Sequence, residues 1–396
     1  MKKMNRFVFL SFLISFAFSA WAATDFDAWK ESFYKKAQKQ HISNEILDNY
    51  FSKATYLPRI IELDRKQPEF SVSFGNYMQR AVSDTRIKKG QELLKKHSQL
   101  LKKIEQDYGI PSHYLVAFWG IETNFGDTKG QVDILNALAT LSFDTRRQEF
   151  FSEQLMTLLK ILQKEKIEVP TGSWAGAFGH FQFMPTTFYQ YAVDEDGDGQ
   201  RDILNSFEDA AGSAANYLSK IGWKKGESWG REVILPKELS SRADEKHLLK
   251  EWVTFGVKRA DGRTYLPNDM NIEAKLILPE GVNGPAFLVY KNFDVIKRWN
   301  RSDFYALAIG ILADKIAQKN TLDVKKIKVL PNQAKTDIKL LQETLKEEGL
   351  YDGKIDGIMG SSTKAALKNY QNKKGLLPDG FLSKELLEDL RKKEKQ

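Results

Sequence analysis

Glu122 is the residue of this sequence best placed for acid–base chemistry. It lies near the end of a mostly apolar stretch that begins at Pro111 and ends at Gly126, and this pattern predicts a buried helix that stops at a turn. Burial among aromatic side chains disfavours the charged carboxylate and raises its pKa, as a general acid near neutral pH requires. Glu122 is therefore a candidate general acid, and a helix-end glutamate turned toward solvent is the alternative.

A second stretch, residues 172–187, combines glycines, aromatic rings and neutral polar side chains. Its three glycines within eight residues allow the backbone to approach a ligand closely. Ser173 and Gln182 offer uncharged hydrogen-bonding groups among the rings. Sugars present hydroxyl groups at their edges and apolar C–H faces, so this composition suits a sugar polymer.

The loop from Asp194 to Asp202 matches the opening of an EF-hand. Oxygen ligands stand at positions 1, 3 and 5, a glycine at position 6 and a backbone-carbonyl donor at position 7, namely Asp194, Asp196, Asp198, Gly199 and Gln200. The glutamate usual at position 12 is replaced by Asn205. We expect a structural calcium ion here, with a metal-free acidic turn as the alternative.

The first 22 residues predict a secretory signal peptide, because a basic start and a short apolar run precede an A-x-A motif at residues 20–22. The sequence has no cysteine, which excludes disulfides, thiolate metal sites and a lipid anchor attached through cysteine. We therefore expect a periplasmic protein without a transmembrane segment after signal cleavage. An uncleaved anchor is the alternative.

The formal net charge of +8 suits an anionic polymer or surface as partner, although a mildly basic protein is ordinary. Neither a G-x-G-x-x-G nor a Walker-type loop occurs, so no organic cofactor is expected. Lysine-rich segments such as 91–103 are expected to be solvated helix faces, so no nucleic-acid partner is expected either.

The sequence predicts an α+β fold that is mainly α-helical. Apolar residues recur at helical spacing at 42–51, 91–104, 111–121, 150–161 and 207–218. Short β-favouring runs predict a small inserted antiparallel sheet, at 232–235, 252–257, 271–278 and 286–290. Helix returns at 302–316, where small residues favour close packing on the core.

Residues 120–126 and 173–185, in this order, resemble the lytic murein transglycosylases of the membrane-bound B type. The resemblance covers residues 25–317 and extends to five further motifs, at 64–70, around Asp194, and at 214–218, 222–223 and 298–302. It implies a lysozyme-like catalytic core in which Glu122 is the sole acid and base. It also implies substrate contacts from Ser173 and Gln182, and a cleft lined by Trp299, Asn300 and Tyr305.

The resemblance has consequences at two further positions. Trp299 stands where the family commonly has tyrosine, so stacking is kept and the hydroxyl group is lost. The metal loop of the family is closed by a later acid, which points to Asp209, with Glu208 as the second choice.

No acid accompanies Ser173 within residues 173–185, whereas a hydrolytic glycosidase normally uses two carboxylates. The resemblance implies cleavage of the MurNAc-β-1,4-GlcNAc bond without water, in which Glu122 acts first as acid and then as base and a 1,6-anhydromuramoyl end is formed. The alternatives are a hydrolytic muramidase and a non-catalytic wall-binding scaffold.

The tail resembles a three-helix peptidoglycan-binding domain, in which Asp356-Gly357 and Asp379-Gly380 are turns between helices. The expected partner is thus the peptidoglycan glycan strand, and a spacer without affinity is the alternative. The predicted organisation is a signal peptide (1–22), a catalytic domain (23–317), a linker (318–335) and a peptidoglycan-binding domain (336–396).

Overall fold

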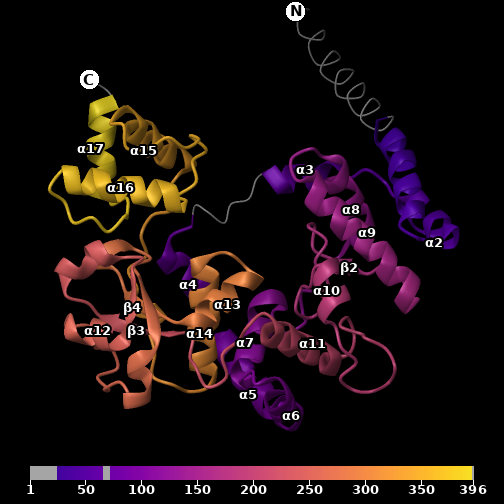
Figure 1. Ribbon diagram of the computed structural model, residues 1–396, viewed down its shortest axis with the longest axis horizontal. Helices are drawn as coiled ribbons and strands as arrows, with labels where there is room; N and C mark the ends of the chain where they lie inside the picture. Colours follow the sequence, from indigo (N-terminus) through magenta and orange to yellow (C-terminus); the bar gives the residue numbers. More distant parts are fainter. Residues whose placement is uncertain (1–24, 66–71, 395–396) are drawn as a thin grey trace, which may run out of the picture. The chain divides into compact units, whose positions relative to one another are not determined.

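The computed structural model describes residues 25–65 and 72–394 (Figure 1). The predicted signal peptide and most of the motif at 64–70 lie outside the described residues. The chain forms two compact units, and each is built from two separate stretches. The first contains the described residues of 1–67 and 126–214, and the second those of 68–125 and 215–396.

The first unit is helical. Residues 25–39 form a helix, and the elements that follow are α2 (Asn44–Asn49), η1 (Phe51–Lys53), α3 (Pro58–Arg65), α8 (Ile134–Phe143), α9 (Gln148–Glu165), α10 (Pro185–Tyr191) and the start of α11 (Phe207–Lys220). Helices α8 and α9 pack side by side, as Figure 1 shows, and both bury apolar faces. The short strands β1 (Val132–Asp133) and β2 (Thr171–Gly172) pair antiparallel.

The helical part of the second unit surrounds two buried helices, α7 (Ser112–Thr123) and α14 (Asp303–Ile316), which pack against each other. The other helices are α4 (Phe74–Ala81), α5 (Asp84–Lys96), α6 (Ser98–Tyr108) and α13 (Lys291–Trp299). Gly310 of α14 lies against the indole of Trp229, where a Cβ atom would be 2.3 Å from the ring. The prediction of close packing through small residues is confirmed.

The second unit also contains a five-stranded antiparallel sheet of order β4-β6-β7-β3-β5. Its strands are β3 (Gly230–Ile234), β4 (Lys246–Leu248), β5 (Lys258–Arg259), β6 (Glu273–Ile277) and β7 (Ala286–Val289). Arg231 pairs with Leu288, and Leu288 pairs with Leu276, so β7 lies between β3 and β6. The predicted small sheet is confirmed.

The strand predicted at 252–257 is wrong, because most of this segment belongs to helix α12 (Leu249–Thr254) or to the turn after it. Glu251 accepts the backbone N–H of Leu248 at 2.8 Å and so caps the helix. Trp252 is fully buried, and its Nε1 donates to the carbonyl of Ala274 at 2.9 Å. Burial of the indole explains an apolar run that a strand would also show.

The predicted linker, residues 318–335, packs against the second unit along its course. Three of its side chains are buried, namely Leu322, Val324 and Ile327, and a 3₁₀ turn spans Val324–Lys326. Asn332 Oδ1 accepts the backbone N–H of Ser73 at 3.0 Å and the side-chain amide of Asn76 at 3.1 Å. These bonds fix the segment to the start of α4.

The tail forms the three predicted helices, α15 (Lys335–Glu347), α16 (Ser361–Lys373) and α17 (Lys384–Glu394). They share a small apolar core built from Leu341, Leu345, Ala366, Leu367, Tyr370, Leu382, Leu386 and Leu390. Within residues 25–65 and 72–394, none of the helices combines the length and apolar character needed to cross a bilayer.

Candidate active site

Glu122 is the second-last residue of α7, a helix in which nine of the twelve residues are buried. The helix ends because Asn124 and Phe125 both adopt left-handed backbone conformations, with φ of 50° and 63°. The chain then folds back, and the ring of Phe125 lies where a Cβ atom on Gly120 would be 2.8 Å away. This turn leaves Glu122 half-buried at the helix end, in contact with α14.

The carboxylate of Glu122 accepts a hydrogen bond from the hydroxyl of Tyr305. Tyr305 lies in the first turn of α14 and is 4% exposed. Burial, and next the negative charge of Glu122, raise the pKa of Tyr305 well above its ordinary value. The phenol therefore stays protonated and donates to Glu122. A glutamate turned wholly toward solvent, the alternative considered above, does not describe this arrangement.

Trp299, at the end of α13, lies beside this pair. Its ring packs on Phe118 of α7 with centroids 4.6 Å apart, and on Tyr217 of α11 at 5.2 Å. Phe118 in turn contacts the ring of Tyr305 at 6.3 Å. Tyr217 was not singled out from the sequence, although it lies within the matched motif at 214–218. Together these rings form an aromatic wall next to Glu122 and Tyr305.

Asn300 follows Trp299 directly and has a local structural role. Its Oδ1 accepts the backbone N–H of Ser302 at 3.0 Å, and Ser302 caps α14 by accepting the N–H of Tyr305 at 3.4 Å. Two successive side-chain bonds thus set the start of the helix that carries the Tyr305 hydroxyl.

Ser173 and Gln182 lie together on one glycine-rich loop of the first unit. Ser173 Oγ accepts the N–H of Ala177 at 3.0 Å, and backbone bridges join Gly172 to Phe178 and Phe178 to Phe183. Gln182 has a left-handed backbone, with φ of 51°, and its amide nitrogen donates to the carbonyls of Lys129 and Gly179 at 3.0 and 3.1 Å. Both side chains therefore hold the loop in shape.

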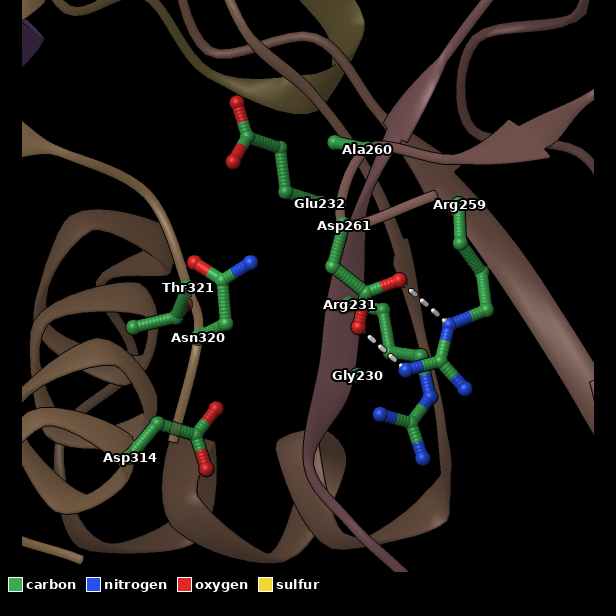
Figure 2. Close-up of a pocket in the computed structure, with 9 residues that line it drawn as sticks. All are labelled: Gly230, Arg231, Glu232, Arg259, Ala260, Asp261, Asp314, Asn320 and Thr321. Carbon is green, nitrogen blue, oxygen red and sulfur yellow. Dashed lines mark hydrogen bonds and ion pairs between the residues drawn. The ribbon is translucent and has the colours of Figure 1, made fainter. Parts of the chain in front are cut away.

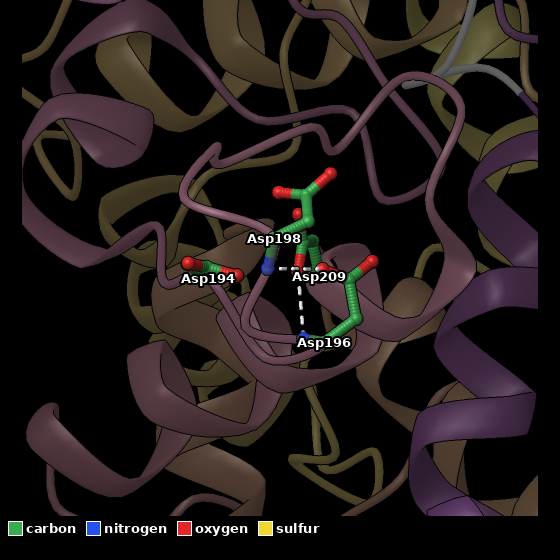
Figure 3. Close-up of side chains that lie close together, drawn as sticks. All are labelled: Asp194, Asp196, Asp198 and Asp209. Atoms are coloured by element: carbon green, nitrogen blue, oxygen red, sulfur yellow. Dashed lines mark hydrogen bonds between the residues drawn. The ribbon is translucent and has the colours of Figure 1, made fainter.

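Four of the predicted metal ligands form one acidic cluster, as Figure 3 shows. Each of Asp194, Asp196, Asp198 and Asp209 offers a carboxylate oxygen, and these oxygens all lie within 4.8 Å of one another. Such hard oxygen donors are the set that calcium prefers. The fifth predicted ligand, Gln200, is placed beside them through its N–H, which donates to Asp198 at 2.8 Å.

Asp209 comes from α11 and is fully buried, whereas the three loop acids are exposed. Its carboxylate accepts the backbone N–H groups of Glu195 at 2.7 Å and Asp202 at 2.8 Å. Burial raises the pKa of Asp209, against the effect of these bonds. Asp209, rather than Glu208, is the acid that the structure places with the loop.

A separate small pocket of about 60 Å³ lies between β3, β5 and the end of α14 (Figure 2). Arg259 and Asp261 form a two-bond ion pair on one side, and Asp314 on the other accepts the indole N–H of Trp229 at 2.9 Å. None of its lining residues was predicted from the sequence as a site residue. Three of its charged side chains, Arg259, Asp261 and Asp314, are paired inside the protein.

Comparison with known proteins agrees with this geometry. Residues 25–314 match a transglycosylase SLT domain, and residues 334–390 match a putative peptidoglycan binding domain. Membrane-bound lytic murein transglycosylase B of Escherichia coli is 31% identical over 301 residues, which cover 72% of this chain and 81% of that protein.

Three solved structures extend the comparison. SltB3 from Pseudomonas aeruginosa, in complex with NAG-NAM-pentapeptide, has a TM-score of 0.87 and 37% identity over 92% of this chain and 99% of its own. A second SltB3 structure holds NAG-anhNAM-pentapeptide. Slt35 from Escherichia coli, in complex with calcium, has a TM-score of 0.63 and 30% identity over 73% of this chain and 92% of its own.

The fold and the glutamate at the end of a buried helix define a lytic transglycosylase, which confirms the prediction from the sequence. The chain belongs to the SLT transglycosylase family, since the family model matches well over half of it.

Proposed function

We propose that this enzyme cleaves the MurNAc-β-1,4-GlcNAc bond of peptidoglycan without water, and that it releases 1,6-anhydromuramoyl ends. The observation that carries the proposal is the hydrogen bond from Tyr305 to Glu122, which fixes a single carboxylate at the end of a buried helix. SltB3, which shares the fold over nearly the whole chain, has been solved with both a NAM and an anhNAM ligand.

Glu122 would act twice in this reaction. It first donates its proton to the glycosidic oxygen, while the N-acetyl group of the muramoyl residue stabilises the cationic sugar. The ionised carboxylate then takes the proton of the C6 hydroxyl, which attacks C1 and closes the anhydro ring. Tyr305 donates to Oε1 of Glu122 and would so orient the carboxylate for both proton transfers.

The substrate contacts belong to the same proposal. Trp299 offers an aromatic face for a sugar ring, and it is held by Phe118 and Tyr217. Asn300, the next residue, would line the cleft with Trp299 and Tyr305. Ser173 and Gln182 supply uncharged polar groups from the glycine-rich loop, whose shape their own bonds maintain. Uncharged groups suit an uncharged glycan backbone.

The acidic cluster would hold a structural calcium ion through Asp194, Asp196, Asp198 and Asp209, with the backbone carbonyl of Gln200. The ion would offset part of the negative charge of the four clustered carboxylates and would link the loop to α11. The related Slt35 was solved with calcium, which supports this assignment. No organic cofactor is required by the reaction.

The remaining parts of the proposal concern location and binding. The signal peptide (1–22) directs the protein to the periplasm without a lipid anchor, and the mature catalytic domain spans 23–317. The connector 318–335 leads to a domain at 336–396 that binds peptidoglycan and raises the local substrate concentration. The match of residues 334–390 to a putative peptidoglycan binding domain supports this role.

Mass spectrometry of digested sacculi tests the proposed reaction. We expect anhydromuramoyl ends, which are one water lighter than reducing ends. Reducing muramic ends would show a hydrolytic muramidase instead. The variant Glu122→Gln should lose turnover and still sediment with sacculi. Persistent turnover would contradict the role of Glu122, and wild-type protein that binds sacculi without cleaving them would indicate a scaffold.

A further inference from the structure

The C-terminal domain contains the same turn twice, and each turn is held by a glutamine from a preceding helix. Turn 1 is Asp356-Gly357-Ile358, held by Gln342 of α15. Turn 2 is Asp379-Gly380-Phe381, held by Gln371 of α16.

The two turns have matching geometry. In each, the glutamine Oε1 accepts the glycine N–H at 2.8 Å. The glutamine Nε2 donates to the aspartate Oδ1, at 3.0 Å in turn 1 and 2.8 Å in turn 2. The glycines have φ of 74° and 72°, a left-handed conformation that glycine adopts without strain.

The inner oxygen of each aspartate is used within its own turn. Besides the glutamine, Oδ1 of Asp356 accepts the N–H of Ile358, and Oδ1 of Asp379 accepts the N–H of Phe381, both at 2.9 Å. The outer oxygen, Oδ2, points out of the turn's own hydrogen-bond network. It is therefore the atom with which each turn can bind another group.

Turn 2 uses its outer oxygen on a peptide of this chain. Asp379 Oδ2 accepts the backbone N–H of Val282 at 3.0 Å. The preceding residue, Gly281, has φ of 69°, and an L-type Cβ there would lie 2.5 Å from Asp379 Oδ2 and 2.8 Å from Phe381 Cβ. Turn 2 thus binds the amide N–H of Val282, and the residue before this amide, Gly281, has no room for the side chain of an L-amino acid.

The conformation of Gly281 is one that D-amino acids prefer, because positive φ is the mirror image of the helical region of L-residues. A D-residue also carries its Cβ at the other hydrogen position of the α-carbon. A D-residue could therefore take the place of Gly281 at turn 2, and the amide N–H after it could bind Asp379 Oδ2 as that of Val282 does.

Turn 1 offers the same groups to solvent. In the part of the chain that the structure describes, Asp356 Oδ2 accepts no hydrogen bond, and Asp356 is exposed. Ile358, the counterpart of Phe381, is 38% exposed. Turn 1 thus has an exposed apolar side chain beside a charged acceptor, the two kinds of group that turn 2 presents to Gly281 and Val282.

We propose that turn 1 is the ligand site of the C-terminal domain, and that it binds the peptide stem of peptidoglycan at an amide N–H that follows a D-residue. Asp356 Oδ2 accepts this N–H, and Ile358 packs beside the D-residue. Peptidoglycan stems carry D-residues, whereas ordinary protein segments do not. The inference rests on the proposed wall-binding function of this domain, whose ligand and contact residues it specifies.

The substitution Asp356→Asn removes the proposed contact with little change to the turn. The asparagine Oδ1 still accepts from Gln342 and Ile358, while an NH₂ group replaces the outer acceptor and faces the ligand N–H. Asp379→Asn makes the same change in turn 2 and is the matched control. Both are made in full-length Glu122→Gln protein, so that ligands are not cleaved.

The measurement is methyl NMR of isoleucine-labelled protein titrated with NAG-NAM-pentapeptide. We expect the Ile358 methyl signal to shift, while Ile338 in the domain core does not, and we expect Asp356→Asn to weaken binding about tenfold or more, as for the loss of one hydrogen bond to a charged group. Asp379→Asn should leave the affinity within about twofold. A pentapeptide of all-L residues should not shift Ile358.

The outcomes separate the inference from the function on which it rests. Shifts elsewhere in residues 334–394 with none at Ile358, or equal affinity in Asp356→Asn, would overturn turn 1 as the site while leaving wall binding intact. Equal binding of the all-L peptide would overturn the recognition of D-residues. If no signal of this domain responds to the ligand or to added sacculi, the wall-binding function itself is wrong.

Discussion

Tyr305 donates a hydrogen bond to the same carboxylate that is proposed to carry both proton transfers, that of Glu122. The donor is buried and stays protonated, so it orients the carboxylate without competing for its proton. The two residues lie 183 positions apart in the sequence and meet because α7 and α14 pack against each other. This contact makes Tyr305 a positioning residue for the general acid.

Tyr305→Phe should lower kcat by about tenfold to a hundredfold, since a hydrogen bond to a charged group stabilises it by about 1.5–3 kcal/mol. The bond favours the ionised carboxylate, whereas Glu122 must be protonated to act first as the acid, so loss of the bond should also move the alkaline limb of the pH–rate profile to higher pH. Turnover of sacculi across pH measures both effects. Tyr34→Phe is the matched control, because Tyr34 bonds Asp48 at 2.7 Å on the surface. An unchanged pH profile in Tyr305→Phe would contradict the positioning role.

Calcium should stabilise the protein after treatment with a chelator. At one hundred times its Kd, a ligand that binds only the folded state adds about 2.7 kcal/mol, which raises Tm by several degrees. Thermal melts with and without calcium measure this rise, and magnesium, which prefers tight octahedral sites, should give less. Asp209→Asn should abolish the response. A melting temperature that does not change when calcium is added would show that the cluster is only an acidic turn.

Acidification should destabilise the protein through two half-buried histidines, His113 and His180. Burial, and next the charge of Lys319, lower the pKa of His113 to about 3, and burial followed by the charge of Lys129 lowers that of His180 to about 4. In the unfolded chain these imidazoles bind a proton below about pH 6.5, whereas in the folded protein they stay neutral until the pH is much lower. Stability is therefore lost as pH falls from about 6.5 toward those values, by up to about 1.4 kcal/mol per pH unit for each imidazole.

The variant His113→Gln should flatten this dependence between pH 6.5 and pH 4.5, and urea midpoints at several pH values measure the slope. The control is His41→Asn, because His41 is exposed and has a left-handed backbone that asparagine tolerates. A slope in His113→Gln equal to that of the wild type would show that His113 is not neutral in the folded state.

Gly310→Ala should destabilise the second unit by about 1–3 kcal/mol, because the new methyl group would overlap the rigid indole of Trp229. Gly90→Ala is the matched comparison on α5. There the new atom would lie 2.6 Å from Cδ1 and 2.8 Å from Cγ1 of Ile316, an aliphatic side chain that can shift more easily than an indole, and alanine gains up to about 1 kcal/mol in helix propensity. The melting temperature of Gly310→Ala should thus be well below that of Gly90→Ala. Equal melting temperatures would contradict the close packing.

Local sequence patterns were sufficient to predict several features. Pro111 and the apolar run after it indicated the buried helix of Glu122, and the spacing of Asp194, Asp196 and Asp198 indicated the acidic loop. These features depend on residues that are near in sequence. The strand predicted at 252–257 failed, because an apolar run suits a buried helix as well as a strand, and here the run buries Trp252 from helix α12.

Contacts between distant segments could not be read in this way. Tyr305 was suggested only by resemblance, and its bond to Glu122 depends on how α7 meets α14. Both turns were predicted from their Asp-Gly pairs, but their matching glutamine contacts were not, since Gln342 and Gln371 lie 15 and 9 residues before the glycines that they bind. The distance from glutamine to glycine differs between the two turns, so the positions of the glutamines do not form a regular repeat.

The C-terminal helices are not joined to the rest of the second unit by a free linker alone. Asn332 fixes the connector to α4, and Asp379 and Lys368 bond the backbone at Val282 and Ala243, within the same compact unit as Glu122. If a peptide stem binds at turn 1, the distance from turn 1 to Glu122 would therefore be fixed. The enzyme would then cleave the glycan at a defined distance from the bound stem. A domain on a flexible linker would instead allow cleavage at many distances.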